Sequence, residues 1–345
     1  MQYSFKISSV MSDVVSLNHG SGGSQMRNLI ENIFAGKFGM SKPLTDSALL
    51  ENEGYTMAFS TDSYVVDPLF FPGGNIGKLA LCGTVNDLAV SGAIPLWISA
   101  SFIIEEGFPL EDLERIADTM ASEAIKAGVK IVTGDTKVVS KGKCDKLFIT
   151  TAGVGIVKSG FEHISKGSMI KPGDKLIING SLGNHAIAVL GARNNLGFSS
   201  KIESDCASLN HIIQNFFGEC SEIHFMRDLT RGGLAAVLNE VAEMTSLGIS
   251  VQEESIPVDE PVKGLCEMLG FNPLSLANEG KFLLISSGDE SFKILDILRS
   301  HPLGKNAAII GEITDEHEGY VVLKTATGGK RILEMPSGID LPRIC

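Results

Sequence analysis

The chain has 345 residues, 43% of them apolar and 20% charged, a balance typical of a soluble globular protein and not of a disordered chain. Its formal net charge of −12 argues against a surface that binds nucleic acid or anionic membranes nonspecifically. The sequence has no run of roughly 18 apolar residues, the length that a membrane-spanning helix needs.

The N-terminal segment and the cysteines indicate a compartment. Residues 1–17 carry one lysine and no continuous apolar core, so we expect no secretory signal there. The 6 cysteines form no C-x-x-C pair, and without an export signal we expect reduced thiols in the cytoplasm. Cys82 and Cys266 fall within helical patterns of apolar residues, so we expect both in the core.

The first half of the chain alternates predicted strands and helices. The patterns predict strands over 56–66, 96–104, 129–133 and 147–157. They predict helices over 24–34 and 78–90, and a third that begins at 110 and stops at Gly128. This alternation predicts an α/β domain that ends near residue 160.

A stretch rich in Gly, Ser, Lys and Pro over 158–173 marks a domain boundary. Beyond it we predict helices from 184 and over 205–217, 234–242 and 292–299, and strands over 175–179, 282–285, 308–313 and 320–323. They form a second domain of mixed α+β character. The tail, residues 335–345, contains Pro336, Gly338 and Pro342, so we expect it to be irregular and mobile.

A glycine-rich turn stands where a phosphate-binding loop would be expected. The sequence has no G-x-x-x-x-G-K-[ST] loop, and no G-x-G-x-x-G follows a strand. Instead, His19-Gly-Ser-Gly-Gly23 precedes a predicted helix, where free backbone N–H groups can form an anion-binding nest. His19, Gly20, Gly22 and Gly23 are therefore candidate phosphate contacts. The alternative is a structural turn, which is equally common before helices.

Four aspartates are predicted to lie where strands end or helices begin: Asp62, Asp87, Asp135 and Asp228. An acidic protein holds a polyphosphate only if cations neutralise it, and Mg²⁺ prefers a few carboxylates together with phosphate oxygens and waters. Each aspartate alone is better explained as a turn or helix cap. Together, they predict a magnesium–nucleotide site with these four as metal ligands. Its nucleotide contacts are predicted to include Asp62, Asp87, Thr136 and Asp228.

Two further charged residues indicate proton chemistry. Lys137 follows Asp135 closely, and a cation beside metal carboxylates can polarise an oxygen. Glu279 precedes the apolar strand 282–285, where partial desolvation lets a carboxylate act as a general base near neutral pH. The alternative for both is a solvated surface charge.

Cys345 is the last residue of the sequence, within Pro342-Arg-Ile-Cys345. A chain end is the most mobile part of a polypeptide. A thiol placed there can be loaded by one partner, enter an active site and then meet a second partner. A terminal cysteine also arises by chance, so this hypothesis depends on the other motifs.

Four segments together resemble the HypE family of hydrogenase-maturation factors: 59–75, 132–138, 277–281 and the terminal Pro342-Arg-Ile-Cys345. The similarity runs from about residue 18 to the C-terminus. Asn278-Glu-Gly-Lys281 combined with that terminus separates the chain from aminoimidazole ribonucleotide synthetase, selenophosphate synthetase and thiamine monophosphate kinase, which share the fold. Leu229 departs from the family pattern, which has Ala there.

The resemblance implies a two-domain α/β (α+β) ATP-binding fold like that of aminoimidazole ribonucleotide synthetase. An N-terminal ATP-binding domain over 18–160 would pair its sheet with that of a second copy, forming a homodimer. The C-terminal α/β domain would cover 170–334, followed by the mobile tail 335–345. Strands such as 96–104 and 147–157 also need covered edges, which favours the same homodimer.

The resemblance also implies an ATP-dependent carbamoyl dehydratase that acts on its own Cys345. The carbamoyltransferase HypF would load a carbamoyl group onto the thiol. ATP, with Mg²⁺, would phosphorylate the carbamoyl oxygen, and loss of phosphate would leave a thiocyanate. The cyano group would then pass to iron on the HypC–HypD complex as a ligand for nickel–iron hydrogenases. In this scheme Lys137, Glu279 and Cys345 are catalytic.

Two other functions remain open from the sequence. The first is an ATP-dependent kinase or synthetase on the same fold that acts on a free small molecule, for which Cys345 would be dispensable. The second is a non-catalytic thiol carrier, whose nucleotide site would be a regulatory switch.

Overall fold

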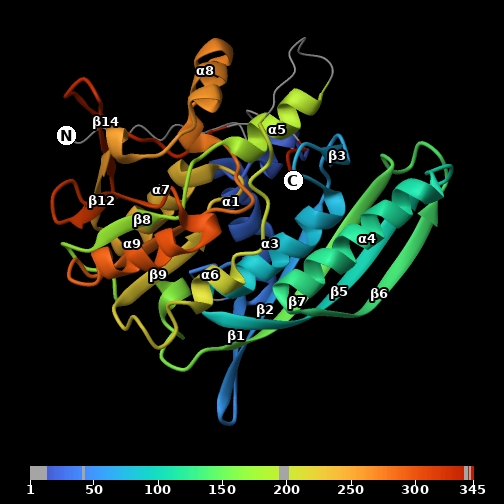
Figure 1. Cartoon of the computed structure of the whole chain (residues 1–345), viewed down its shortest axis with the longest axis horizontal. Helices are drawn as coiled ribbons and strands as arrows, with labels where there is room; N and C mark the ends of the chain where they lie inside the picture. The colour runs from blue at the N-terminus through green and yellow to red at the C-terminus, as the bar shows by residue number, and fades with distance from the viewer. Residues whose placement is uncertain (1–13, 41–42, 194–201, 338–340, 342) are drawn as a thin grey trace.

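The computed structural model describes residues 14–40, 43–193, 202–337, 341 and 343–345. The chain forms two α/β units, each built on its own sheet, and the C-terminal tail returns to lie between them (Figure 1). This confirms the fold class expected from the sequence. None of the helices in the described residues is long and apolar enough to cross a membrane.

The N-terminal unit contains a five-stranded sheet of order β1-β2-β7-β5-β6. Its strands are β1 (Ala48–Asn52), β2 (Tyr55–Tyr64), β5 (Ala93–Glu105), β6 (Lys130–Val139) and β7 (Leu147–Val157). Neighbouring strands are antiparallel except β5 and β6, which are parallel. Helices α3 (Ile76–Val90) and α4 (Leu110–Ala127) cover one face, and β3 (Phe70–Phe71) pairs with β4 (Gly74–Asn75) before α3.

The other face of this sheet is open and partly apolar. Side chains alternate between the two faces along each strand, so residues two apart share a face. Along β7, buried residues facing α3 alternate regularly with partly exposed ones. On the open face Phe59, Trp97 and Ile103 are 41%, 48% and 43% exposed. Apolar area of this kind, gathered on one sheet, is typical of a protein–protein interface.

Helix α3 is buried almost throughout and lies between the two units. It begins after Asn75, whose side chain accepts hydrogen bonds from the backbone N–H groups of Gly77 and Lys78. A helix that is apolar on all sides is stable only when it is covered on all sides. One side of α3 packs on the N-terminal sheet, while Ala89 and Val90 pack against the core of the C-terminal unit.

The C-terminal unit contains a seven-stranded sheet of order β14-β13-β10-β12-β8-β11-β9. Its strands are β8 (Lys175–Ile178), β9 (Ile223–Asp228), β10 (Gly248–Gln252), β11 (Phe282–Ser286), β12 (Ala308–Thr314), β13 (Val321–Lys324) and β14 (Lys330–Ile332). Its helices are α5 (Asn184–Ala192), α6 (Asn210–Gln214), α7 (Gly233–Thr245), α8 (Glu260–Leu269) and α9 (Ser291–Ser300). Ahead of both units lie a 3-10 turn, η1 (Leu17–Gly20), α1 (Ser24–Leu29), a π-helical turn, η2 (Ile30–Ala35), and α2 (Gly36–Phe38).

Three element boundaries differ from the sequence predictions. The helix predicted over 205–217 is only α6, because Asp205 pairs with Lys281 at 3.0 Å and the Leu209 N–H donates to Asn86. The helix predicted over 24–34 is divided between α1 and η2. The strand predicted over 129–133 extends as β6 to Val139, because its parallel pairing with β5 continues. Six strands were not predicted: β1, β3, β4, β9, β10 and β14.

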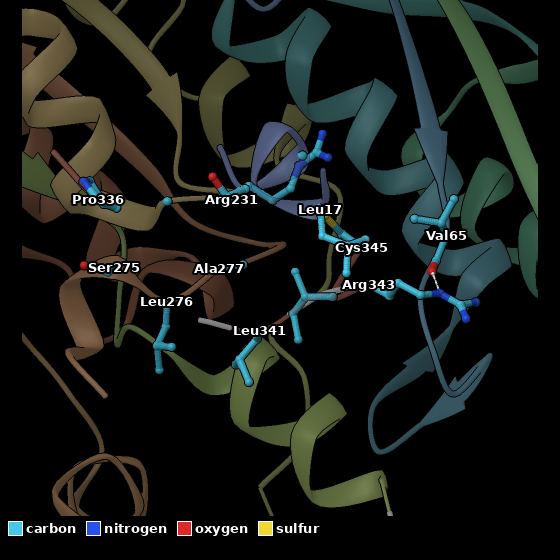
Figure 2. A pocket seen from close by; sticks show the side chains of 14 residues that line it. Leu17, Val65, Arg231, Ser275, Leu276, Ala277, Pro336, Leu341, Arg343 and Cys345 are labelled. Atoms are coloured by element: carbon cyan, nitrogen blue, oxygen red, sulfur yellow. Dashed lines mark hydrogen bonds between the residues drawn. The ribbon is translucent and has the colours of Figure 1, made fainter. Parts of the chain in front are cut away.

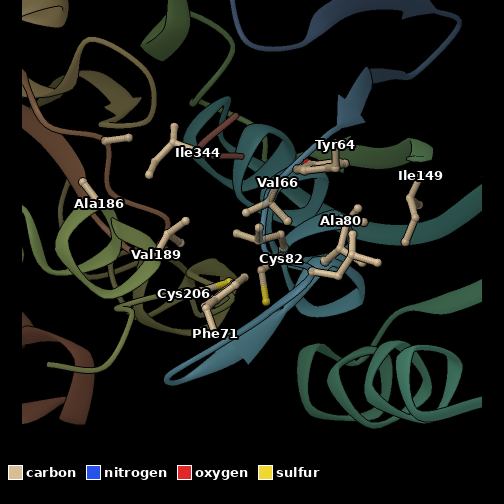
Figure 3. Packing of buried hydrophobic residues seen from close by; sticks show 14 of the residues in the cluster. Tyr64, Val66, Phe71, Ala80, Cys82, Ile149, Ala186, Val189, Cys206 and Ile344 are labelled. Atoms are coloured by element: carbon tan, nitrogen blue, oxygen red, sulfur yellow. The ribbon is translucent and has the colours of Figure 1, made fainter. Parts of the chain in front are cut away.

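The cysteine predictions hold where the structure tests them. All 6 cysteines are free, and Cys82 and Cys266 are buried, as the helical patterns indicated. Cys82 belongs to a hydrophobic cluster between the two units that also contains Val66, Val189 and Ile344 (Figure 3). The tail therefore contributes a side chain to the core.

We predict that Gly77→Ala destabilises the protein, because α3 and α4 meet at this glycine. A Cβ there would lie 2.6 Å from the Ile116 backbone oxygen and 2.9 Å from Met120 Cγ. Overpacking of this kind costs roughly 1–3 kcal/mol. Gly264→Ala is the matched control, because Gly264 is also helical but has nothing within 4 Å of such a Cβ. Thermal or urea unfolding should show a loss for the first variant only; equal behaviour of the two would contradict this packing.

Candidate active site

The last residues of the chain run antiparallel to residues 65–67. The Val65 N–H donates to the Cys345 backbone oxygen at 3.2 Å, and the Asp67 N–H donates to the Arg343 carbonyl at 3.1 Å. Ile344, between them, is buried. This short backbone pairing places the Cys345 side chain in a pocket between the two units (Figure 2).

Side chains from both units hold the tail in this position. The Arg343 guanidinium donates to the Val65 carbonyl at 2.9 Å and pairs with Asp145. Arg193 donates to the Arg343 carbonyl at 2.8 Å. His185 Nε2 lies 2.8 Å from the Ile344 carbonyl. These contacts describe one docked position of the tail; residues 338–340 and 342 lie outside the described structure, and the predicted mobility of the tail stays a prediction.

His185 acts in this arrangement as a neutral donor. Burial lowers the pKa of His185, so its imidazole is neutral at physiological pH. Nε2 must carry the proton, because it meets the Ile344 carbonyl, and Nδ1 accepts from the Ser204 hydroxyl at 2.8 Å. No role was predicted for His185, because a histidine on an apolar helix is usually a core residue.

The Cys345 thiol meets carboxylates as well as a cation. The pKa of Cys345 is raised to about 12, chiefly by burial and also by the neighbouring Glu279 and Asp62, while Arg231 opposes the rise. A docked free thiol is therefore protonated at neutral pH. An uncharged adduct on sulfur avoids that desolvation penalty.

Glu279 lies directly beside the thiol and is only 3% exposed. Burial raises the pKa of Glu279 well above its usual range, and the nearby Asp228 and Asp205 raise it further. Its backbone N–H donates to Asp205 at 3.2 Å, which fixes the residue in place. Its Oε1 has no hydrogen-bond partner among the described residues. A carboxyl group in this state can take up or release a proton near neutral pH.

Four aspartates gather beside Glu279: Asp46, Asp62 on β2, Asp87 on α3 and Asp228 at the end of β9. Ser60 donates to Asp87 at 2.6 Å, and Thr84 and Tyr64 donate to Asp62 at 3.3 Å each. Asp46 pairs with Arg227 at 3.1 Å. Asp46 was not predicted as a site residue, because an aspartate between Thr and Ser is indistinguishable from a turn cap.

Burial and, after it, mutual repulsion set the electrostatics of this cluster. Burial raises the pKa of Asp87 and of Asp228 well above the ordinary value, and each is raised further by the other aspartates. Burial also raises the pKa of Asp46, to about 6, although Arg227 opposes the rise. Within the described part of the chain no three His, Cys, Asp or Glu side chains are arranged closely enough to hold a metal ion by themselves. The donor set still suits Mg²⁺, which takes few carboxylates and completes its shell with phosphate and water.

Asp135 and Lys137 lie apart from this cluster. They form an exposed ion pair with each other, at 2.6 Å, on β6. Their pairing partners Ser101 and Ile103 face the open side of the sheet, whereas Asp62 on β2 faces α3. Two strands, β7 and β5, separate β2 from β6. One chain therefore does not bring Asp135 or Lys137 to Asp62. Asp135 also lies within a strand, not at its end as predicted, and Thr136 faces α4.

The glycine-rich turn lies beside Arg231. The His19 ring accepts from the Ser16 N–H at 3.0 Å, so it is engaged locally. Gly20 lines the pocket that contains Cys345, whereas Gly22 and Gly23 line a second, larger cavity. The turn therefore borders both cavities, and its predicted contact with phosphate stays a prediction.

The two cavities differ in size and lining. The smaller, of about 190 Å³, surrounds the docked tail. The larger, of about 630 Å³, has an apolar part and an acidic end that contains Asp46 and Asp228. The apolar part is formed by α1, α7 and their neighbours, with Met26, Ile30, Phe225, Val237 and Met244. Its lining suits a ligand with an apolar part and an anionic part that reaches the acidic end together with a metal cation.

Both halves of the chain match known families. Residues 44–157 match AIR synthase related protein, N-terminal domain, and residues 171–324 match AIR synthase related protein, C-terminal domain. A relative from Rhodobacter capsulatus named carbamoyl dehydratase HypE is 50% identical over 336 residues, which cover 96% of this chain and 98% of the relative.

Two solved structures are similar over most of the chain. One is described as a HypE–HypF complex; it has a TM-score of 0.84 and 47% identity, and the match covers 89% of this chain and 99% of that chain. The other is HypE in complex with ATP, with a TM-score of 0.81 and 44% identity, covering 96% of this chain and 100% of that chain.

We predict that Asp87→Asn stabilises the ligand-free protein at neutral pH. The raised pKa of Asp87 means that the unfolded chain loses this proton at lower pH than the folded protein does. The free energy of unfolding therefore falls as pH rises above 3.8, the ordinary pKa of an aspartate. An asparagine at this position does not ionise, so the variant does not lose stability in this way. Thermal melts from about pH 4 to 7 should show a gain that grows with pH. A variant less stable than the parent at pH 7 would contradict the repulsion.

Proposed function

This chain belongs to the HypE family of carbamoyl dehydratases, and from this membership we propose that it converts an S-carbamoyl group on its own Cys345 into a thiocyanate, using ATP and Mg²⁺. The observation that carries the proposal is the docked tail, which places the Cys345 sulfur beside the buried Glu279 and Arg231. The similar chain solved with ATP supports the nucleotide. The product would supply cyanide ligands for the iron of nickel–iron hydrogenases.

The proposed reaction has two steps, phosphorylation of the carbamoyl oxygen and elimination of phosphate. The carbamoyl oxygen attacks the γ-phosphorus of ATP, which releases ADP and one N–H proton and leaves an S–C(=NH)–O–phosphate group. The C–O bond then breaks, the second N–H proton leaves with the phosphate, and a C≡N triple bond forms on sulfur. Phosphorylation converts a poor leaving oxygen into a good one. The chain must therefore hold ATP, remove protons and exclude water.

Glu279 is positioned to remove the N–H protons. It is buried, it contacts the sulfur that carries the group, and its raised pKa matches a base that works near neutral pH. Ile344 is packed in the hydrophobic cluster and also lines the pocket that contains Cys345, which keeps this side of the pocket apolar. Exclusion of water protects the intermediate from hydrolysis.

The larger cavity is the proposed nucleotide site. Its apolar part accommodates a purine, and its acidic end lies beside the aspartate cluster. Asp62, Asp87 and Asp228, with Asp46, would hold Mg²⁺. The bound ion would neutralise the phosphates and offset the repulsion among these carboxylates. The predicted phosphate contacts of the glycine turn fit the same cavity, since Gly22 and Gly23 line it.

The proposed homodimer forms through the open face of the N-terminal sheet. Phe59, Trp97 and Ile103 give that face its apolar area, and β6 leaves an unpaired edge. Lys137 does not meet Glu279 within one chain, so a catalytic role for it requires the second copy. The same condition applies to Asp135 as a metal ligand and to Thr136 as a nucleotide contact.

The proposed partners act on the undocked tail in the cytoplasm. A similar chain is solved with HypF, which supports a carbamoyltransferase as the loading partner. The HypC–HypD complex would accept the cyano group. Both partners must reach a sulfur that the docked state encloses.

Intact-protein mass spectrometry tests the function. Carbamoylated protein mixed with Mg²⁺–ATP should lose the mass of one water, and Cys345→Ala should neither accept the carbamoyl group nor change mass while still binding ATP. Cys144→Ala is the matched control, because Cys144 is also partly exposed. A small-molecule kinase would leave the protein mass unchanged and tolerate Cys345→Ala. A thiol carrier would keep its carbamoyl group in the presence of ATP.

Glu279→Gln should leave a protein that is carbamoylated and binds ATP but stalls before the thiocyanate. General acid–base groups contribute roughly 10²–10⁴-fold in rate. The amide keeps the shape of the side chain, so thermal stability should not fall. Single-turnover mass spectrometry measures the rate, and thiocyanate formation at the parental rate would place the base elsewhere.

Trp97→Glu should weaken the homodimer, because it places a charge on the open apolar face. Sedimentation velocity at micromolar concentration should show a dimer for the parent and monomer for the variant. Phe292→Glu is the control, since Phe292 is exposed on α9 in the other unit. A parent chain that sediments only as a monomer would refute the interface.

A further inference from the structure

We propose that Arg231 is a further catalytic residue, whose guanidinium holds the phosphoryl group while it passes from ATP to the carbamoyl oxygen on Cys345. This inference rests on the proposed function. Neither the sequence patterns nor the resemblance singled out Arg231, because Thr230-Arg-Gly-Gly233 is typical of a turn before a helix.

Arg231 lies at the junction of the two cavities. It lines the pocket that contains Cys345 and also the larger cavity with the acidic end, and it is the one described residue that lines both. In Figure 2 its side chain rises from the segment before α7 beside Cys345. A group that moves from a nucleotide in the larger cavity to the sulfur adduct in the smaller one must pass this side chain.

No hydrogen bond or ion pair fixes the guanidinium of Arg231 within the described part of the chain. Among the described residues no carboxylate lies within ion-pair distance of it, although Cys345, Glu279 and Asp62 are close enough to raise its pKa. Two other arginines around the site form ion pairs with carboxylates. Arg227 pairs with Asp46 and Glu240, and Arg343 pairs with Asp145. A partly buried cation without a partner is costly, so an anionic ligand is the natural partner.

The backbone of Arg231 is held by glycines. Gly22, at φ +79°, packs so closely that a Cβ would lie 2.6 Å from Arg231 Cβ and 2.7 Å from its carbonyl carbon. Gly232 follows at φ +81° and approaches the Gly22 carbonyl. Both positions therefore require glycine. The glycine turn thus fixes the position of the Arg231 backbone and Cβ. Stabilisation of a transition state requires groups that are held in place in this way.

The chemistry needs a planar, multidentate cation at this point. During transfer, negative charge spreads over the three peripheral phosphoryl oxygens, and the bond to the ADP oxygen breaks as the bond to the carbamoyl oxygen forms. A guanidinium can bind two of these oxygens at once, whereas an ammonium binds as a point charge. Arg231 donates hydrogen bonds throughout and loses no proton.

Calorimetry separates a phosphoryl contact from a structural role. Arg231→Ala should leave the affinity for ADP unchanged but weaken that for a non-hydrolysable ATP analogue by roughly tenfold, since one charge-assisted contact is lost. Arg231→Lys should restore part of the analogue binding but little of the rate. Arg299→Ala is the control, because Arg299 lies on α9 and bonds only the Ala307 carbonyl among the described residues.

Single-turnover assays on the carbamoylated proteins complete the test. Arg231→Ala should release ADP roughly 10²–10³-fold more slowly than the parent, and added guanidinium ions should restore part of that rate. Parental rates in Arg231→Ala, or equal losses of ADP and analogue binding, would overturn the inference while leaving the function intact. A carbamoylated parent that consumes no ATP would overturn both.

Discussion

The burial of negative charge between the two units is the constraint on which the rest of the site depends. Asp87 and Asp228 come from different units, and burial and mutual repulsion raise the pKa of each. Arg227 offsets only part of this charge, through Asp46. Such an arrangement persists only because the surrounding packing is strong, and it is stabilised further by any cation that enters. The site therefore selects ligands that bring their own positive charge.

Helix α3 links the charged residues of the two units through the hydrogen bonds of Asn86. Asn86 donates to the Glu279 carbonyl at 3.2 Å and the Ala207 carbonyl at 3.1 Å, and it accepts from the Leu209 N–H at 2.7 Å. The next residue along the helix is Asp87. The proposed metal ligand Asp87 and the proposed base Glu279 are thus linked through one side chain, and their separation is set by buried hydrogen bonds that are costly to break. These hydrogen bonds therefore hold Asp87 and Glu279 at a fixed separation.

Much of the site could be predicted from local sequence, and what was missed depends on tertiary structure. Glu279 was found because a carboxylate before an apolar strand is visible in the sequence. Asp135 was grouped with the other aspartates because it was expected at a strand end, and Lys137 because it follows Asp135 closely. The direction in which a strand residue points depends on pairing that a motif does not reveal. Asp46 and Arg231 were missed because in sequence each resembles a turn residue, and only packing brings them to the cavities.

Under the proposed function, the docked tail also requires loading and dehydration to be separate states. The contacts that hold it, from residues 65–67 and His185, all reach backbone atoms and do not depend on what the sulfur carries. Free and loaded tails differ in the chemical state of the sulfur, which is a thiol in the first and carries a carbamoyl group in the second. A free thiol docks only in protonated form, since its pKa there is about 12, and in that form it is a poor nucleophile. Loading therefore requires the undocked tail, whereas a neutral carbamoyl group enters the pocket without opposing the carboxylates around it.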